Sequence, residues 1–476
     1  MRSKIALWRT LLVVAISLGL LAFTDADSLA MTWTPSGQDP VGAANAQDGK
    51  TAYIVVRFGE HDVIIRSVAF TETITALEAL EATGLAHTTD DTGFGAFLCS
   101  IGDVGDSSSA CDNGNRYWAT YQWTGEAWEP RMVGVADAEI TEDGHVEGFS
   151  WADASGTPVD PPPALPLVAA QRGLDWLLAQ EQEDAGYGSA GNTAEVLIAL
   201  AANRQEAAEA TVANMLAAAN DFAADPSGAG KLALALTAHG ICWPYGAPQP
   251  MEYFDAETGS FDPGSAPDAV AMLGTAALDQ ATPPSATTHL LEQQQLDGGW
   301  EWGAGWGSDT NSTALAIQAL VAAGEPVTSA AIVSATTYLA EAQNDDGGFP
   351  YSPVSEWGTD SDSNSTAYVV KALLAIGEDP TSGEWVVDGN SPISYLLGMQ
   401  LEDGSFEWQL GAGPNQSSTQ QVIPPLLGRW FPLVRTELAS CEPQSLPASG
   451  GTKEGDLSAT ERLLWVSTPD GLSIAR

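Results

Sequence analysis

Basic residues are scarce in this chain. Its 476 residues include 17 Lys and Arg against 62 Asp and Glu, which gives a formal net charge of −45. A surface of that sign repels nucleic acid and anionic lipid, so neither is expected as a partner. The same charge keeps a protein solvated and suits a salty or acidic exterior.

Long hydrophobic runs are absent after the first thirty residues. Basic residues precede one apolar run, Leu11 to Phe23, and Ser28-Leu29-Ala30 is suited to cleavage, so residues 1–30 are predicted to be a signal peptide. The run is short for a membrane span, although an uncleaved anchor stays open as an alternative. The rest of the chain is therefore expected outside the cytoplasm, either secreted or at the cell surface, with membrane contact only through this segment.

Cysteine and histidine are also rare, with four and five copies. Neither a Cys-x-x-Cys pair nor a His-rich spacing is present, so the sequence predicts no metal site and no required cofactor. In an exported chain, four cysteines favour disulfides. Cys99 and Cys111 are close in sequence and are expected to close one loop. Cys242 and Cys441 are a candidate second pair that would tie the C-terminal part shut.

Catalytic motifs are missing as well. The sequence has no Gly-rich phosphate loop, no nucleophile elbow and no convincing pair of carboxylates. The many acidic residues make chance pairs plentiful, so pairs alone indicate nothing. The residues by themselves leave open whether the protein is an enzyme.

Composition divides the chain into segments. The β-rich runs Tyr53 to Phe58 and Val63 to Ile65 predict a hairpin, and a short helix, Ala76 to Ala82, is expected after Thr75. Beyond a run of prolines the chain is rich in Ala and Leu and is expected to be helical. The predicted segments are the signal peptide (1–30), a polar linker (31–49), a β-rich domain (50–152), a Pro-rich linker (153–164), a helical domain (165–441) and a flexible tail (442–476).

One short phrase occurs three times in the helical part, each time after an apolar stretch that ends in Gln. The copies are Asp297-Gly298-Gly299-Trp300, Asp346-Gly347-Gly348-Phe349 and Asp403-Gly404-Ser405-Phe406. Self-similarity of this length predicts helix pairs that bury their apolar faces on their neighbours. Three weaker turns raise the expected number of hairpins to six. The predicted fold is mostly α, a closed (α/α)6 toroid of six inner and six outer helices preceded by a small α+β domain.

The repeated phrase has a plain structural interpretation. Gly turns the chain out of the outer helix, and the aromatic residue fills a gap between hairpins. The Gln and Asp side chains are expected to bind exposed backbone groups.

A second phrase follows the first two copies, Asn311-Ser312-Thr313-Ala314 and Asn364-Ser365-Thr366-Ala367. These residues are expected to cap inner helices, whose free N–H groups would face one mouth of the toroid. Aromatic and acidic residues on the nearby loops suggest recognition of a flat or sugar-like ligand, although capping and loop packing also explain them. The candidate ligand-binding residues of the mouth are Trp302, Trp306, Asp309, Asn311, Tyr351, Trp357, Asp360, Asp362, Asn364, Trp408 and Gln416.

The helical part resembles the terpenoid-cyclase and protein-prenyltransferase superfamily, whose members carry a Gln-x-x-Asp-Gly-Gly-Trp repeat. Squalene–hopene cyclases in that superfamily protonate their substrate with the middle Asp of an Asp-x-Asp-Asp-Thr-Ala phrase. The matching phrase here begins at Asp362 but has Asn364 and Ser365 in place of the later acids. The zinc ligands of prenyltransferases are also missing.

Residues 50–152 resemble the small β-grasp-like domain that accompanies a helical toroid in transcobalamin and intrinsic factor. That resemblance rests on Thr75 to Leu80, the strand end at Cys99 to Gly102, Tyr117-Trp118 and the closing Asp143-Gly144 strand. It implies that cobalamin could be a bound ligand and that Tyr117 and Trp118 could contact it. The order of the two domains is reversed relative to those carriers.

These resemblances lead to three functional hypotheses. The main expectation is an exported, non-catalytic protein that captures cobalamin or another bulky micronutrient between its domains and has an uptake transporter as partner. The first alternative is a terpenoid cyclase-like or polysaccharide-active enzyme on the same toroid. The second is a surface adhesion or scaffold protein.

Overall fold

The computed structural model describes residues 49–59, 62–91, 96–108, 111–154, 160–244, 246–355 and 358–433, and two short strands beyond them. These two strands, β13 (Gln444–Ser445) and β14 (Leu463–Leu464), pair with each other in antiparallel fashion. The predicted signal peptide and most of the predicted linker and tail lie outside the described residues. In the described part of the chain no helix is both long and apolar enough to cross a bilayer.

The N-terminal part is a five-stranded sheet with one helix against it. The order of the sheet is β2-β1-β10-β7-β8, with β1 and β10 parallel and every other neighbour antiparallel. The hairpin and the helix predicted from the sequence are both present. The elements are β1 (Lys50–Gly59), β2 (Asp62–Phe70), β3 (Ile74–Thr75), α1 (Ala76–Ala82), β4 (His87–Asp91), β5 (Ala96–Ile101), β6 (Val104–Gly105), β7 (Arg116–Trp123), β8 (Trp128–Pro130), β9 (Glu139–Ile140) and β10 (His145–Asp153).

Alternation along the strands gives this sheet two apolar faces. Ile54 and Val56 of β1 belong to one buried cluster, which also contains Leu80 of α1. Val55 of the same strand and Ile65 of β2 belong to another, which continues into the helices that follow. The sheet is therefore covered by α1 on one side and by the helical part on the other.

Asn203, just after the third helix, continues the sheet beyond its edge strand β2. Its Oδ1 accepts from the Ile65 N–H at 2.9 Å, and its Nδ2 donates to the Ile65 carbonyl at 2.8 Å. Because an unpaired strand edge is open to other chains, this side-chain pairing closes part of the edge with the protein's own helical part.

A disulfide joins Cys99, in β5, to Cys111 in the loop before β7, as the sequence predicts. Cys242 is buried, while Cys441 lies outside the described residues, so their pairing stays a prediction.

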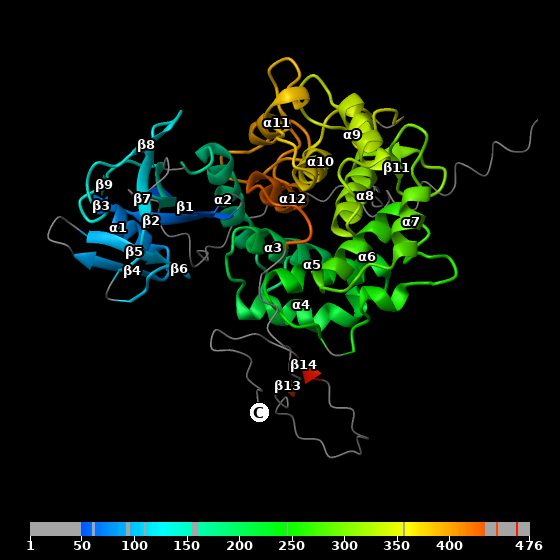
Figure 1. Cartoon of the computed structure of the whole chain (residues 1–476), viewed down its shortest axis with the longest axis horizontal. Helices are drawn as coiled ribbons and strands as arrows, with labels where there is room; N and C mark the ends of the chain where they lie inside the picture. Colours follow the sequence, from blue (N-terminus) through cyan, green and yellow to red (C-terminus); the bar gives the residue numbers. More distant parts are fainter. Residues whose placement is uncertain are drawn as a thin grey trace, which may run out of the picture. The chain divides into compact units, whose positions relative to one another are not determined.

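The C-terminal part is a ring of helices in two layers (Figure 1). Each inner helix packs against the next, and the last packs against both the first inner helix and α2, so the ring is closed. The inner helices are α3 (Ala190–Ala202), α5 (Pro226–Ala238), α6 (Ser265–Ala277), α8 (Thr310–Ala322), α10 (Ser363–Ile376) and α12 (Gln416–Leu426). The outer layer holds α2 (Ala164–Leu178), α4 (Glu209–Phe222), α7 (Pro284–Glu292), α9 (Ala330–Ala342) and α11 (Pro392–Gly398).

One outer position differs from the prediction of six outer helices. Between α5 and α6 the described residues form only a short 3-10 helix, η2 (Pro250–Tyr253). Pro244, Pro248 and Pro250 lie close together there, and proline lacks the N–H that an α-helix needs in its interior.

The inner helices α5 and α6 approach each other closely at a pair of glycines. A Cβ atom on Gly274 would lie 2.4 Å from the Gly230 Cα, and one on Gly230 would lie 2.3 Å from the Val270 carbonyl oxygen. Both contacts are with backbone, which cannot rotate away. Glycine is therefore required at this crossing.

We expect Gly274→Ala to destabilise the toroid by about 1–3 kcal/mol, because an added methyl group overpacks a helix crossing. Chemical unfolding monitored by circular dichroism measures this. The matched control is Gly398→Ala in α11, where nothing lies within 4 Å of the added Cβ. That variant should be neutral or slightly more stable, since Ala is the better helix former. Equal stability of the two variants would contradict the proposed crossing.

Candidate functional site

The glutamine of the repeated phrase joins each turn to the next outer element. In each copy the side-chain Nε2 donates to the carbonyl of the first Gly of its own turn and to a second backbone carbonyl further along the ring. Gln294 binds Gly298 and Ala331 of α9, and Gln343 binds Gly347 and Trp385 just before α11. Gln400 binds Gly404 and Ala169 of α2, so the last repeat is fastened to the first helix of the ring.

The rest of the phrase fixes the start of the following inner helix. The Asp297 Oδ1 accepts from the Gly299 N–H and from the Ser308 hydroxyl, and Trp300 donates its backbone N–H to the Thr313 hydroxyl of α8. The other two copies make the equivalent backbone bonds through Phe349 to Thr366 and Phe406 to Thr419. These bonds confirm the structural interpretation of the phrase.

Half-exposed aromatic residues occupy one equivalent position in all three copies. Trp302, Tyr351 and Trp408 each lie two residues after the buried aromatic, and their exposed fractions are 49%, 43% and 45%. The backbones of the last two meet the starts of α8 and α10, where Thr310 and Ser363 donate to their carbonyls. The Trp302 carbonyl lies beside Gly264, which precedes α6. These three predicted site residues therefore lie at the end of the ring at which the inner helices begin, which we call the mouth.

Two buried carboxylates cap inner helices at the mouth, whereas the sequence predicted the caps two or three residues later, in the phrases that begin at Asn311 and Asn364. Those phrases lie within the first turns of α8 and α10. Asp309 caps α8 and accepts from the N–H and the hydroxyl of Ser312, both at 2.7 Å. Asp362 caps α10 in the same way and accepts from both groups of Ser365 at 2.8 Å. Both side chains are almost fully buried.

Burial raises the pKa of Asp309 and of Asp362 above the ordinary value, because a charged carboxylate is poorly solvated there. Hydrogen bonds from Ser312 and Tyr351 to Asp309, and from Ser365 and Trp408 to Asp362, only partly offset this effect. Each carboxyl therefore holds its proton more firmly than a surface acid does.

Capping alone does not require an acid at these positions. Asn415 caps α12 and Ser189 caps α3 through the same bond to the third residue of the helix. Asn, Ser and Asp are comparably good caps, so a neutral residue would serve α8 and α10 without burying a charge. The two acids consequently suggest chemistry at the mouth.

Two other predicted residues have structural roles. Asn364 accepts from the Ser418 hydroxyl and donates to the Gln421 side chain, both at 2.7 Å, and so ties α10 to α12. Gln416 donates to the Tyr187 carbonyl and ties α12 to the first hairpin. Asn364, which matches the proton donor of the cyclase phrase, therefore has an amide side chain that bonds α10 to α12.

The remaining predicted residues are not all brought to the mouth. Trp306 is 74% exposed in a glycine loop, Asn311 is half-buried at the start of α8, and Trp357 lies outside the described residues. Trp118 is buried in the β-rich part, where it packs against Phe58 and Trp151 on the α1 side of the sheet. Tyr117 points to the other face of the sheet by strand alternation.

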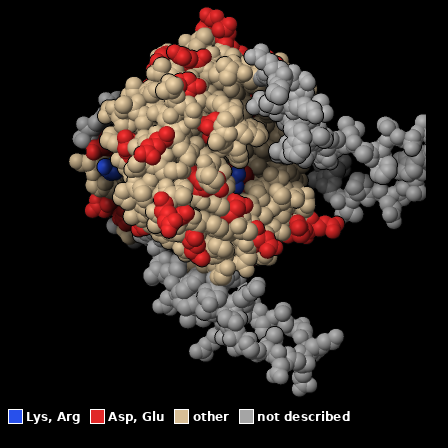
Figure 2. Space-filling view, turned by 90° about the vertical axis from the view of Figure 1, so that its right-hand side faces the viewer, with Lys and Arg blue, Asp and Glu red and all other residues tan. Residues whose placement is uncertain are grey.

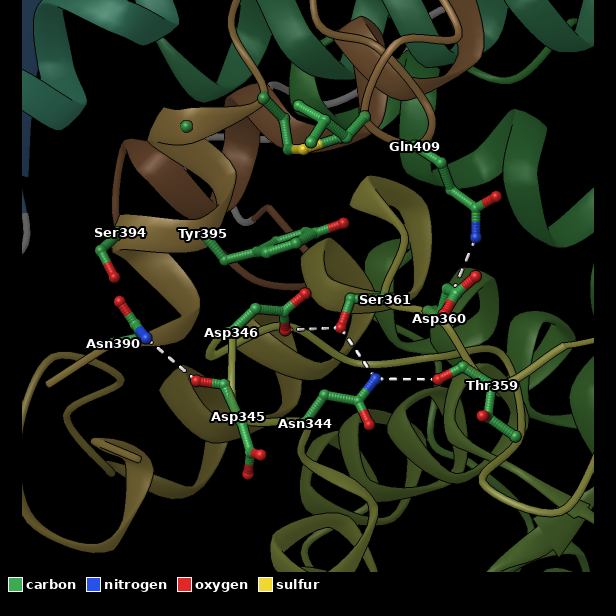
Figure 3. Close-up of a pocket in the computed structure, with 13 residues that line it drawn as sticks. Asn344, Asp345, Asp346, Thr359, Asp360, Ser361, Asn390, Ser394, Tyr395 and Gln409 are labelled. Carbon is green, nitrogen blue, oxygen red and sulfur yellow. Dashed lines mark hydrogen bonds between the residues drawn. The ribbon is translucent and has the colours of Figure 1, made fainter. Parts of the chain in front are cut away.

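Asp360 lines an open pocket of about 770 Å³ beside the second repeat (Figure 3). Asp345, Asp346 and Tyr395 also line it. Asp346 is already engaged by the Gly348 N–H and the Ser361 hydroxyl, and Asn344 donates to the Thr359 carbonyl and the Ser361 side chain. Most of the polar lining therefore belongs to the bonds that hold the repeat together.

A charged cluster lies inside the ring and was not predicted from the sequence. Lys231 of α5 donates to Glu195 of α3 at 2.6 Å, and Tyr368 and Lys371 of α10 lie beside them. The sequence did carry a signal for this cluster, because Glu195, Lys231 and Lys371 are each the only charged residue of a mostly apolar helix. Such residues are rarely buried without a partner or a role.

Residues 263–433 match the family model of the squalene-hopene cyclase C-terminal domain. The match covers the part of the toroid that contains all three repeats, Asp309 and Asp362. The toroid is thus terpenoid cyclase-like, as the sequence predicts. No curated protein sequence matches this chain.

Solved terpene cyclases show low similarity to the chain. The type II terpene cyclase MstE from Scytonema, in its apo form, is 14% identical with a TM-score of 0.42, over 56% of this chain and 98% of that one. The ent-copalyl diphosphate synthase from Streptomyces platensis is 20% identical with a TM-score of 0.36, over 58% of this chain and 56% of that one.

The family match corrects the main functional expectation. A non-catalytic protein that captures cobalamin or another micronutrient was expected, because the acids of the cyclase phrase are replaced and the β-rich part resembles transcobalamin. The match to a cyclase domain over 263–433 points instead to a cyclase-like enzyme, the first alternative. That expectation was wrong because it gave one missing motif more weight than the repeats as a whole.

We expect Asp309→Asn and Asp362→Asn to be more stable than wild type at pH 7. A carboxyl whose pKa is raised on folding stabilises the fold when protonated, and that contribution is lost as the pH rises from the unfolded pKa of about 4 through the folded value. The advantage of each variant should therefore shrink towards pH 3. Thermal unfolding across this range measures it.

The control for this experiment is Asp225→Asn, which replaces the exposed cap of α5 by an equally good cap. It should be about as stable as the wild type at pH 7. A stability difference between wild type and the Asp309 and Asp362 variants that does not depend on pH would contradict the assignment.

Proposed function

We propose that the protein is a cyclase-like enzyme whose toroid protonates an electron-rich, apolar substrate at its mouth, with Asp309 and Asp362 as candidate acids. The observation that carries this is the pair of buried carboxyls with raised pKa at the starts of α8 and α10, although neutral residues cap the inner helices α3 and α12 in the same way. The family match over the same residues supports it.

The arrangement has the parts that proton-initiated cyclisation needs. A general acid must hold its proton at the working pH and lie close to the reacting atom. Protonation forms a C–H bond at one alkene carbon and leaves a cation on the other, which a second double bond attacks. Loss of a proton then completes an isomerisation that needs no further reactant.

Aromatic side chains at the mouth suit the cationic stage of this reaction. The faces of Trp and Tyr attract a cation by about 0.5–2 kcal/mol. Trp302, Tyr351 and Trp408 lie around the two acids and keep almost half of their surfaces exposed. They are therefore available to an apolar substrate.

The proton donor would differ from that of squalene–hopene cyclases, as the sequence implies. Asn364 and Ser365 occupy the positions of the two later acids of the cyclase phrase, and both are engaged in bonds within the ring. The remaining candidate proton donors are Asp362, the first acid of the phrase, and Asp309, which is its equivalent one hairpin earlier.

Several finer expectations stay proposals. An isoprenoid substrate is proposed from the cyclase match, and export is proposed from residues 1–30, which lie outside the described residues. The likeness of residues 50–152 to the β-rich domain of transcobalamin is a proposal about fold only.

The test is incubation of the purified full chain with squalene and with geranylgeranyl compounds in D2O, followed by mass spectrometry. The expected product is cyclised and carries one deuterium, because the first step transfers a solvent-exchanged proton to carbon. Asp309→Asn and Asp362→Asn should each be assayed, and loss of the true acid should lower turnover by about 10²–10⁴-fold.

The control is Asp225→Asn, which should keep turnover within about twofold of wild type because its cap lies on the exposed start of α5. Turnover that survives both Asp309→Asn and Asp362→Asn would remove these acids from the mechanism. Cyclised product without deuterium would rule out initiation by protonation.

A further inference from the structure

Charged side chains from opposite sides of the ring meet at its centre. The inner order α3-α5-α6-α8-α10-α12 places α5 and α10 three positions apart, so their side chains approach each other only across the central space. Lys231 comes from α5, Glu195 from α3, and Tyr368 and Lys371 from α10. Electrostatic interactions link all four groups.

The segment after α12 closes the other end of this space. Arg429 donates to the Ala202 carbonyl at the end of α3, and the Phe431 N–H donates to the Gln318 side chain of α8 at 3.1 Å. The centroid of the Phe431 ring also lies 4.4 Å from the Lys371 Nζ. The charged groups therefore lie above a floor formed by this segment.

The central charges do not balance. The Glu195 carboxylate binds Lys231 directly, and burial, which alone would raise its pKa, is outweighed by Lys231 and Lys371, so the pKa of Glu195 is lowered. The second ammonium of the cluster belongs to Lys371, which is only 1% exposed. Its Nζ lies 4.2 Å from the centroid of the Tyr368 ring and 4.4 Å from that of the Phe431 ring. Among the described residues it has neither a hydrogen bond nor a carboxylate partner of its own.

A buried ammonium without an anion is costly, and proteins keep such groups where something else compensates the charge. Aromatic faces compensate only part of it. Solvent reaches the cluster, because the Lys231 side chain is 29% exposed. In Figure 2 acidic side chains are scattered over the surface, while a basic side chain lies in a hollow near the middle of the face.

We propose that the centre of the toroid binds an anionic oxygen group, a carboxylate or a phosphate, beside Lys371 and Lys231. The anion supplies the negative charge that Glu195 alone cannot supply to two ammonium groups. Trp302, Tyr351 and Trp408 add half-exposed aromatic surface at the mouth, so the ligand we propose has an apolar part and an anionic end. This site does not depend on the proposed cyclisation, because binding needs neither Asp309 nor Asp362.

The protonation of Lys371 gives the site a pH dependence. Burial lowers the pKa of Lys371 to about 8, Glu195 opposes this, and Lys231 adds to it. Anion binding should therefore be strongest below pH 8 and weaken above it as Lys371 loses its proton. The strongly negative surface repels anions at long range, but salt at 0.15 M screens charges beyond about 8 Å.

The experiment is isothermal titration calorimetry of the full chain with inorganic phosphate, inorganic diphosphate and sodium decanoate at constant ionic strength. Saturable binding of at least one probe is expected at pH 7, weaker by about tenfold at pH 9. Tighter binding of decanoate assigns the site to an apolar carboxylate, and tighter binding of diphosphate assigns it to a phosphate-bearing molecule. Absence of binding by all three probes at 10 mM overturns the proposal.

Two variants locate the site. Lys371→Met should weaken binding at least tenfold and yet fold, because an apolar side chain of similar length replaces a buried charge. Glu195→Gln should tighten binding, since it removes the competing carboxylate. Lys50→Met, which removes a lysine from β1, is the control and should bind as wild type does.

Unchanged affinity in Lys371→Met would overturn the proposal whatever the result of the turnover assay. If the cyclisation assay fails, the anion-binding proposal still stands or falls with the calorimetry alone.

Discussion

At each of the three repeated phrases, one glutamine side chain holds a hairpin of the toroid to the next. Its amide binds the carbonyl of its own tight turn and a backbone carbonyl of the next outer element, so a single residue fixes both the turn and the distance to the neighbour. Gln400 makes the same pair of bonds with Ala169, far away in the chain. This last contact adds to the packing of α12 on α2 and α3, which closes the ring.

Closure determines where the functional groups lie. Once the turns are fixed, the inner helices begin at one end of the ring, and their caps and the half-exposed aromatics gather there. Asp309 and Asp362 are unfavourable choices for stability, since each buries an acid where Asn415 and Ser189 show that a neutral cap suffices. Groups that are kept at a cost to stability are typical of active sites.

The protein as a whole is strongly negative, whereas the charged cluster at the centre of its ring has more positive than negative groups. A chain with 17 basic residues and a net charge of −45 places two lysines inside its ring with a single buried glutamate between them. Under the two proposals above, the apolar part of a substrate would lie at the aromatic mouth and its anionic end near Lys371.

The sequence alone determined the repeating architecture, since the period of the Gln-Asp-Gly-aromatic phrase dictates paired helices. The two β-rich runs likewise predicted the hairpin of β1 and β2. The sequence also included Asp309 and Asp362 among the candidate site residues, because they are acids on the loops beside the inner helices. It did not recognise them as the caps, since it expected the helices to begin within the later Asn-Ser-Thr phrases. It did not reveal the short η2 in place of a sixth outer helix, although three nearby prolines indicated a break. Only the tertiary structure decided that Lys231, Glu195 and Lys371 form one cluster. Those residues lie on helices far apart in the chain, and ring closure alone turns them towards a common centre.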